Sequence, residues 1–320
     1  MRELAVEEVH QQIDDYLETM SAADRDVEIA FYGGSFTGIP IELQDKYLAV
    51  AKLYLDAKKI DGIRLSTRPD YIDEKTLQRL KAFGVTIVEL GVQSMDDQVL
   101  IKANRGHTAA QVQQAVELLQ RYDFQVGLQM MVGLPGDSKL LALATAHKLI
   151  SLQPDFVRIY PVLVITRTPL AELFQSGQYR PWSVEQAVDT CKELLMLFRT
   201  AGISVIRMGL QPSEEINENA RVLAGPFHPA FGELVEIALV RDRLIGLCRS
   251  LRLDATVAQN LSDTTLVIKL SPRDESIVRG QGNSTIKELN AKFGFKAIRL
   301  QKDETLPRGE YQVMQEPDLG

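Results

Sequence analysis

The sequence predicts an α/β fold built around a parallel sheet, and two observations support this prediction. Segments with helical apolar periodicity alternate with short runs rich in β-branched and aromatic residues. The short runs are apolar on both faces, which is typical of parallel strands that are covered by helices on each side. Right-handed strand-helix-strand connections arrange such units as a barrel or as an open doubly wound sheet, and these observations leave both arrangements open.

The expected elements follow one another in a regular order. Apolar positions three and four residues apart predict helices over about residues 4–20, 41–58, 73–83, 109–121, 137–151 and 183–201. Continuous apolar runs predict the strands VEIAFY (27–32), GIRLST (62–67), VTIVELGV (85–92), QVGLQMMVG (125–133), FVRIYPVLV (156–164) and ISVIRMG (203–209). Because the series begins with a helix, the strand that should precede this helix is missing.

The rhythm of alternating elements changes near residue 215, and this change predicts two domains. Residues 1–214 form the expected sheet domain, and residues 215–320 form an extension that ends in a small α+β module. Pro226 and Pro229 lie in an apolar, aromatic setting near the boundary, which is not typical of a flexible linker.

Composition narrows the class of protein. A chain of 320 residues with 45% hydrophobic composition can bury a sizeable core. We find no apolar run of membrane-spanning length and no signal-peptide pattern, so we expect a cytoplasmic protein without a membrane partner. Cys191 and Cys248 lie far apart in helix-like sequence, which predicts buried thiols and no metal site. The net charge is −7, but residues 243–308 carry 12 basic and 7 acidic side chains, a surplus compatible with a polyanion.

Candidate binding residues follow the predicted strands, because parallel α/β proteins bind ligands at the carboxyl ends of their strands. Glycine allows close approach of the backbone to a ligand, while Ser and Thr supply hydroxyl groups. The residues at these positions are Gly33, Gly34 and Ser35, then Ser66, Thr67 and Arg68, then Gln93, then Gly133 to Gly136, and then Tyr160. The glycine pair is also compatible with a simple tight turn, and its spacing fits neither the GxGxxG nor the GxxxxGK[ST] phosphate loop.

Glu89 is an unusual residue for its position. It lies inside the apolar run TIVELGV. A buried carboxylate is costly unless it is paired, hydrogen-bonded or solvated by a site. We therefore expect Glu89 to have a functional role.

Several longer stretches carry a resemblance to a known family. They are FYGGSFTGI, RLSTRPDYID, ELGVQSMDDQVLIKANRGHT, MMVGLPGD, VRIYPVLVITRTPL, RMGLQ and AGPFHPAFGELVE, in this order between about residues 5 and 245. Together they resemble the radical S-adenosylmethionine (SAM) superfamily, in particular the branch that contains the catalytic subunit of Elongator and its small bacterial relatives. The resemblance implies a partial (β/α)6 barrel that here lacks its first strand, followed by the small C-terminal α+β module.

The resemblance also implies cofactors and partners. Members of the family bind SAM and a 4Fe-4S cluster, and reductive cleavage of SAM yields a deoxyadenosyl radical. The implied partners are tRNA or another RNA, and an electron donor for an active enzyme. The implied SAM-binding residues are Gly33, Gly34 and Ser35 at the amino group, Ser66, Thr67 and Arg68 near the ribose and substrate, Glu89 and Gln93 on the barrel strand that faces SAM, Arg105 at the carboxylate, and Met131, Gly133 and Pro135 around the adenine.

One family feature is absent from this sequence. The family holds its cluster with a CxxxCxxC loop, and three thiolates are needed because each binds one iron. Cys191 and Cys248 are too few and lie elsewhere. We therefore expect this chain to be inactive, and three explanations stay open: a truncated or internally started version of a longer protein, which we favour, a degenerate relative, or ligands from a partner chain. The exposed sheet edge also predicts poor stability or aggregation.

The C-terminal segment gives a weaker signal. We find no acetyl-coenzyme A loop like that of the Elongator acetyltransferase domain. The stretch VRGQGNSTIKELNAKFGFKAIRL loosely resembles the GxxG helix-turn-helix of KH-type RNA binders, although Gly280 and Gly282 are two residues apart and not three. RNA binding and a structural cap for the barrel are both compatible with this module.

The sequence therefore favours a radical SAM enzyme of the Elongator-like branch that modifies a nucleoside in tRNA or another RNA. A first alternative is a non-catalytic RNA- or nucleotide-binding relic of the barrel. A second alternative is a radical SAM enzyme that acts on a small metabolite or a porphyrin-like substrate.

Overall fold

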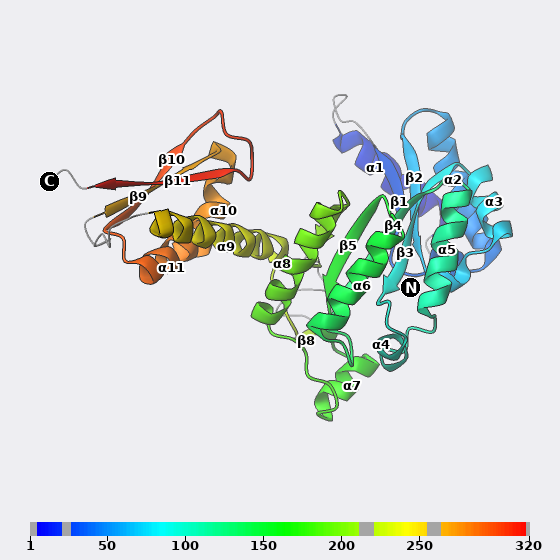
Figure 1. The fold of residues 1–320 in the computed structure, drawn as a ribbon. Helices are drawn as coiled ribbons and strands as arrows, with labels where there is room; N and C mark the ends of the chain where they lie inside the picture. Colours follow the sequence, from blue (N-terminus) through cyan, green and yellow to red (C-terminus); the bar gives the residue numbers. More distant parts are fainter. Residues whose placement is uncertain (1–4, 21–26, 211–220, 255–263, 318–320) are drawn as a thin grey trace. The chain divides into compact units, whose positions relative to one another are not determined.

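The computed structural model describes residues 5–20, 27–210, 221–254 and 264–317 (Figure 1). The chain divides into two compact units, Met1–Phe227 and His228–Gly320. The domain boundary that the sequence suggests after residue 214 lies outside the described residues and stays a prediction.

The first unit is built on a six-stranded sheet in which every neighbouring pair of strands is parallel. The strands are β1 (Glu28–Phe31), β2 (Gly62–Thr67), β3 (Val85–Gln93), β4 (Gln125–Val132), β5 (Phe156–Pro161) and β7 (Ser204–Met208), and they lie in this order across the sheet. The expectation of a parallel α/β half-barrel is confirmed. The central strand β3 is almost entirely buried, which explains its continuous apolar sequence.

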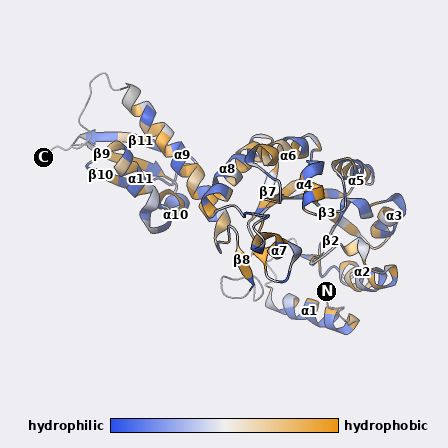
Figure 2. Cartoon of the chain, turned by 90° about the horizontal axis from the view of Figure 1, so that it is seen from below, coloured by the Kyte–Doolittle hydropathy of each residue, from blue (hydrophilic) through white to orange (hydrophobic). Residues whose placement is uncertain are grey.

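One helix precedes β1, and the others lie in the connections between successive strands of the sheet. They are α1 (Val6–Thr19), α2 (Ile41–Asp56), α3 (Glu74–Ala82), α4 (Asp97–Lys102), α5 (Ala109–Arg121), α6 (Lys139–Ser151), α7 (Pro169–Gln175) and α8 (Val184–Thr200). Side chains of Asp73, Thr108, Ser138 and Ser183 accept hydrogen bonds from the first turns of α3, α5, α6 and α8, and so fix where these helices begin. The helices carry both hydrophilic and hydrophobic residues (Figure 2), as expected of helices with one face on a sheet and one in water.

The predicted strand 156–164 is shorter in the structure, and this part of the prediction was wrong. β5 ends at Pro161, which has no N–H to continue the ladder. The chain then forms β6 (Val164–Ile165), which pairs antiparallel with β8 (Val222–Ala224) in a separate two-stranded sheet. Periodicity alone could not detect this break, because the apolar run continues through it.

The second unit is a small α+β module, as the sequence predicts. Helix α9 (Phe231–Asp254) is followed by β9 (Thr264–Leu270), α10 (Glu275–Arg279), α11 (Ser284–Phe293), β10 (Ala297–Lys302) and β11 (Tyr311–Pro317). The central strand β9 pairs in parallel with β10 and antiparallel with β11. This unit has its own core, which includes Leu244, Cys248, Ile268, Val278 and Leu289.

Two expectations concern the chain as a whole. Cys191 in α8 and Cys248 in α9 are both fully buried, so the prediction of buried thiols is confirmed. Within the described ranges, we find no helix with the length and apolar character needed to cross a membrane.

Candidate functional site

A cavity of about 620 Å³ opens at the carboxyl end of the parallel sheet. Residues on or just after β1, β2, β3, β4, β5 and β7 line it, because parallel strands bring their carboxyl ends to one edge. Of the residues predicted from the sequence, the lining includes Gly33, Gly34, Ser35, Ser66, Thr67, Arg68, Glu89, Gln93, Arg105 and Met131. Gly133 and Pro135 are not among the lining residues.

The glycine pair leaves the backbone bare at the end of β1. Gly33 has a φ of 101°, a conformation that favours glycine, and both Gly33 and Gly34 are exposed. The chain then turns into a short 3-10 helix, η1 (Phe36–Gly38), whose Phe36 is buried. The loop thus has one anchored end and an open backbone that lines the cavity.

Arg105 is a partly buried cation that has no carboxylate partner among the described residues. Its guanidinium makes a weak contact, from Nη2 to the sulfur of Met131 at 3.9 Å. Burial, together with the positive charge of Arg68, holds the pKa of Arg105 below its usual value. The neighbouring Arg68 differs, because Asp70 accepts two hydrogen bonds from it at 2.8 and 2.7 Å. A cation without a counter-ion at a cavity wall favours an anionic ligand group.

The segment that carries Arg105 is anchored to the sheet. The buried His107 has its Nε2 3.0 Å from the carbonyl oxygen of Val92. Arg68 donates to the carbonyl oxygen of Gly106 at 3.0 Å. Two contacts therefore fix this loop beside the end of β3.

Gln93 enters the cavity through an irregularity in β3. The register shifts between Gly91 and Gln93, and Gln93 has a φ of 68° although it is buried. A non-glycine residue keeps this conformation only where its surroundings hold it. Gln129 donates to its Oε1 at 3.3 Å, and a Cβ on Gly91 would lie 2.7 Å from its Nε2. Gly91 therefore leaves the room that the Gln93 side chain occupies.

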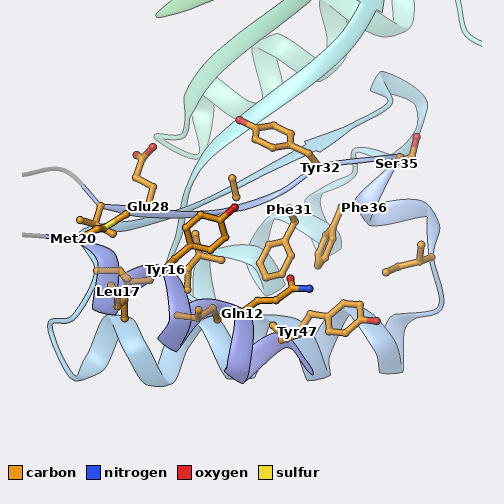
Figure 3. Close-up of a pocket in the computed structure, with 18 residues that line it drawn as sticks. Gln12, Tyr16, Leu17, Met20, Glu28, Phe31, Tyr32, Ser35, Phe36 and Tyr47 are labelled. Atoms are coloured by element: carbon orange, nitrogen blue, oxygen red, sulfur yellow. The ribbon is translucent and has the colours of Figure 1, made fainter. Parts of the chain in front are cut away.

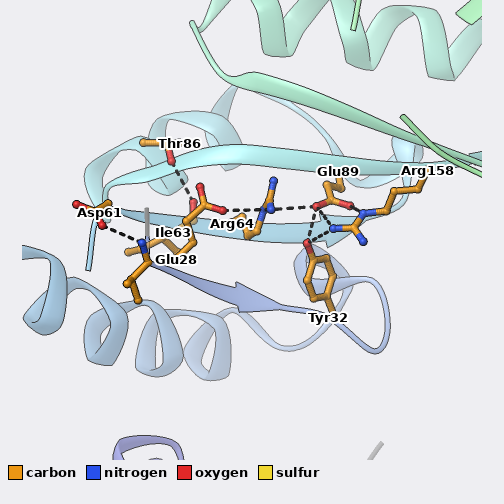
Figure 4. Close-up of polar contacts among 9 residues, drawn as sticks. Glu28, Tyr32, Asp61, Ile63, Arg64, Thr86, Glu89 and Arg158 are labelled. Carbon is orange, nitrogen blue, oxygen red and sulfur yellow. Dashed lines mark hydrogen bonds and ion pairs between the residues drawn. The ribbon is translucent and has the colours of Figure 1, made fainter. Parts of the chain in front are cut away.

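Glu89 is the centre of a network of polar contacts (Figure 4). Its carboxylate accepts from the Tyr32 hydroxyl at 2.5 Å and from Arg158 Nε at 2.7 Å, and Arg64 Nε lies 3.5 Å away. Burial and the bond to Glu89 raise the pKa of Tyr32, so the phenol stays protonated and donates. Burial opposes the charge of Arg158, yet the bond to Glu89 raises its pKa overall. The network thus pairs the buried carboxylate, while its assignment to cofactor binding stays a prediction.

Gly127 makes this network possible. Glu89 lies on β3 and Arg158 on β5, so their side chains meet across β4, where Gly127 is the partner of Glu89 in the register. A Cβ on Gly127 would lie 2.9 Å from Cγ of Glu89 and 2.4 Å from the ring of Phe156. Glycine on the middle strand is therefore required for the carboxylate to reach Arg158.

The turn that contains Gly133 and Pro135 is held by side chains below the cavity. Asp137 accepts from the N–H groups of Gly133 and Ser138, both at 2.8 Å, and the Tyr179 hydroxyl donates to the carbonyl of Gly133 at 2.6 Å. Burial raises the pKa of Asp137 to about 6, although these backbone donors favour its charged form. The contact of this turn with the adenine of SAM stays a prediction.

Sequence reasoning missed several polar residues of the cavity, among them Tyr32, Gln129 and Arg158. Each of Gln129 and Arg158 interrupts an apolar strand, which is the same signal that identified Glu89. Tyr32 gave no such signal, because it reads as the last aromatic residue of an apolar strand. A systematic search for polar residues inside apolar strands would have found Gln129 and Arg158.

A second cavity, of about 680 Å³, lies beside β1 (Figure 3). Six consecutive residues, 27–32, line it, and the facing wall is the apolar side of α1 with Val9, Ile13, Tyr16 and Leu17. Alternate strand residues point to opposite faces of a sheet. A lining of consecutive residues therefore places this cavity along the free edge of β1.

Comparisons with known proteins agree with this architecture. The family described as "Radical SAM superfamily" matches residues 1–145, and the "Radical_SAM C-terminal domain" matches residues 154–241. A tRNA uridine(34) acetyltransferase of Methanocaldococcus jannaschii is 31% identical over 193 residues, which cover 54% of this chain and 36% of that protein. Elongator complex protein 3 of Homo sapiens is 28% identical over 250 residues, which cover 71% of this chain and 44% of that protein.

A solved structure is also similar. The archaeal Methanocaldococcus infernus Elp3 with an N-terminal deletion matches with a TM-score of 0.64 and 25% sequence identity, over 75% of this chain and 59% of that chain. The chain thus spans less than half the length of these curated relatives.

Proposed function

Because this chain belongs to the radical SAM superfamily, and within it to the Elongator-like branch, we propose that its strand-end cavity binds SAM and serves the modification of a nucleoside in tRNA or another RNA. The relatives whose names refer to tRNA uridine 34 and to Elongator support the choice of tRNA. The whole reaction and its partners are part of this proposal.

The observation that carries the proposal is the pairing of an open backbone with an unpaired cation in one cavity. SAM presents a carboxylate and an amino group on the same carbon. Arg105 would hold the carboxylate by charge-assisted hydrogen bonds, and the bare backbone at Gly33 and Gly34 would admit the amino group. The hydroxyl group of Ser66 and the side chain of Gln93 supply further polar partners in the same cavity.

The residues of this chain do not fit a 4Fe-4S cluster. The sequence contains two cysteines, and three thiolates are required. Cys191 and Cys248 are fully buried and lie in different units, and the described residues contain no group of three or more His, Cys, Asp or Glu side chains placed to hold a metal ion. We therefore propose that these 320 residues alone bind SAM without cleaving it. In this respect they would behave like the first alternative, a non-catalytic nucleotide-binding barrel.

Binding of SAM to the purified chain tests this proposal. We expect Arg105→Met to weaken SAM binding by about 10- to 100-fold in isothermal titration calorimetry, because a hydrogen bond to a charged group contributes about 1.5–3 kcal/mol. Arg121→Met is the matched control, since Arg121 is exposed on α5 and lies outside the cavity. The proposal fails if SAM does not bind the unaltered chain, or if the two variants bind it equally well.

A further inference from the structure

We propose that the turn at 280–283, between α10 and α11, binds the backbone of single-stranded RNA. The turn belongs to the second unit, and none of its residues lines the strand-end cavity. The choice of tRNA as the natural RNA rests on the proposed function. Binding of RNA to the turn needs neither SAM nor a cluster.

The turn exposes an unusually bare backbone. Gly280, Gly282 and Asn283 all have positive φ angles, of 68°, 59° and 62°. A Cβ on Gly280 would lie 2.5 Å from Oγ of Ser284, so only glycine fits there. Residues 281–284 are exposed to solvent. Gly280 itself is buried, so the chain presents main-chain groups to solvent mainly at Gly282, which has no side chain to shield them.

The structure also explains why the spacing of the two glycines departs from the GxxG pattern. Counted from Gly280, the fourth position of the turn is Asn283, which adopts the left-handed conformation. Asn tolerates this conformation better than other non-glycine residues. The turn is thus a four-residue GxxN turn, with Gln281 and Gly282 at the two middle positions.

The amino end of α11 lies directly at this turn. Asn283 makes no side-chain cap to the helix, so the first N–H groups of this ten-residue helix are available to an anion. Thr285, in the first turn, is fully buried, and its hydroxyl has no hydrogen-bond partner in the part of the chain that the structure describes. A Cβ on Gly280 would lie 2.8 Å from this hydroxyl, so it faces the turn. A buried polar group without a partner is rare and favours a ligand nearby.

The order of elements around the turn is that of a known type of RNA-binding module. The strand β9 leads through α10, the turn and α11 to β10, and the two strands pair in parallel. In KH modules a turn between two helices clamps the backbone of single-stranded nucleotides. The agreement in connectivity and in the conformation of the turn favours single-stranded RNA over a duplex.

The charge of the segment is complementary to RNA. Residues 273–302 contain seven basic and three acidic side chains. The three acids are already engaged, Asp274 by Arg308, Glu275 by Arg279 and Lys302, and Glu288 by Arg241. Three exposed cations have no ion-pair partner within the described ranges: Arg273, Lys287 and Lys292. The segment therefore offers free positive charge beside the bare turn.

Fluorescence anisotropy with a labelled unstructured RNA oligonucleotide, and with refolded transfer RNA, tests the proposal on the full chain. Gly282→Asp places a carboxylate on the turn, and we expect it to weaken binding by about tenfold or more because like charges repel in an interface. Gly282→Asn is its neutral control. No atom lies within 4 Å of the new Cβ, and both residues tolerate the φ of 59°.

A second pair of variants tests the electrostatic contribution to RNA binding. We expect Lys287→Ala to reduce the slope of log Kd against log salt by about one. Arg249→Ala removes the same charge from α9, about 18 Å along the helix from Ile237, the α9 residue beside Gly280. It should leave RNA binding unchanged.

The proposal is overturned if the chain does not bind RNA, or if a duplex binds as tightly as the single strand. It is also overturned if the Gly282→Asp and Gly282→Asn variants bind RNA with equal affinity. It is also overturned if Arg249→Ala weakens binding as much as Lys287→Ala. SAM binding measured on the same variants should not change. If the unaltered chain binds RNA but does not bind SAM, only the proposed function is contradicted.

Discussion

Glu89 shows how one buried charge organises a site. Its carboxylate is 3% exposed and contacts Tyr32 just after β1, Arg64 from β2 and Arg158 from β5. Such a group is tolerated because the opposite charges and hydrogen bonds replace the water that burial removes. The same contacts connect β2, β3, β5 and the residue after β1 beside the cavity, so the network holds these strands together.

A double-mutant cycle tests this role. We expect Glu89→Gln and Arg158→Gln each to lower the free energy of unfolding by about 3–5 kcal/mol, because each removes one partner of the charge-assisted hydrogen bond between these two largely buried side chains. The double variant should cost little more than either single change. Urea denaturation measures all four proteins. Additive losses would show that the two side chains contribute independently.

At the residue scale, the sequence identifies much of the site but not its internal contacts. Glu89 stands out because it interrupts an apolar strand, and Gly33 and Gly34 because of their place after one. The partnership of Glu89 with Arg158 is invisible in the sequence, since it depends on strand order and on the space that Gly127 leaves. Residues 69 positions apart become neighbours only once the sheet is assembled.

Among the elements, β1 is the strand with the least support. It pairs with β2 on one side, and the second cavity lies along its other edge. The other edge strand, β7, also has one neighbour in the sheet, β5. Exposed edges and unfilled apolar space both lower local stability. The aggregation that the sequence analysis expects stays a prediction, and β1 is where we place its cause.

Hydrogen exchange distinguishes these strands. We expect the amides of β3 to exchange most slowly, those of β7 faster and those of β1 fastest, because β3 has two neighbours and β1 has both a free edge and a cavity. Mass spectrometry of peptic peptides that cover the three strands gives the rates. Equal protection of β1 and β7 would mean that the cavity does not weaken β1.

Elements are the level at which the sequence predicts most. The alternation of apolar periods locates the six strands of the sheet and the helices between them, since each period follows from burial on one or two faces. It misses the end of β5, because a single proline changes the pairing without changing the apolar pattern. It also misjudges the turn after α10, where the conformation of Asn283 and not the count of glycines decides the geometry.

Considered as a whole, the molecule combines a strand-end cavity, which we propose for SAM, with fewer cysteines than a 4Fe-4S cluster requires. Its two cysteines are buried in separate cores, one in α8 and one in α9. No rearrangement of side chains alone brings them to the cavity. The cavity and the ligands for iron are therefore separate features, and this chain has the cavity but not the three thiolates.

Anaerobic incubation with iron, sulfide and a reductant tests this separation. We expect the 320-residue chain to show no 4Fe-4S absorption and to release no 5′-deoxyadenosine from SAM, because it cannot supply three thiolates. A variant with Cys191→Ala and Cys248→Ala is the control for iron that binds without specificity. A stoichiometric cluster in the unaltered chain, lost in this variant, would contradict the prediction.

The burial of both cysteines has a practical consequence for the study of this chain in solution. Thiolates are the reactive form of cysteine, and burial raises the pKa of Cys191 well above its usual value. Maleimide dyes and spin labels should therefore not react with either native thiol in the folded protein. A cysteine introduced at the exposed Gln281 would carry the single reactive sulfur of the folded chain. A single label can therefore be attached to the folded chain without first replacing its native cysteines.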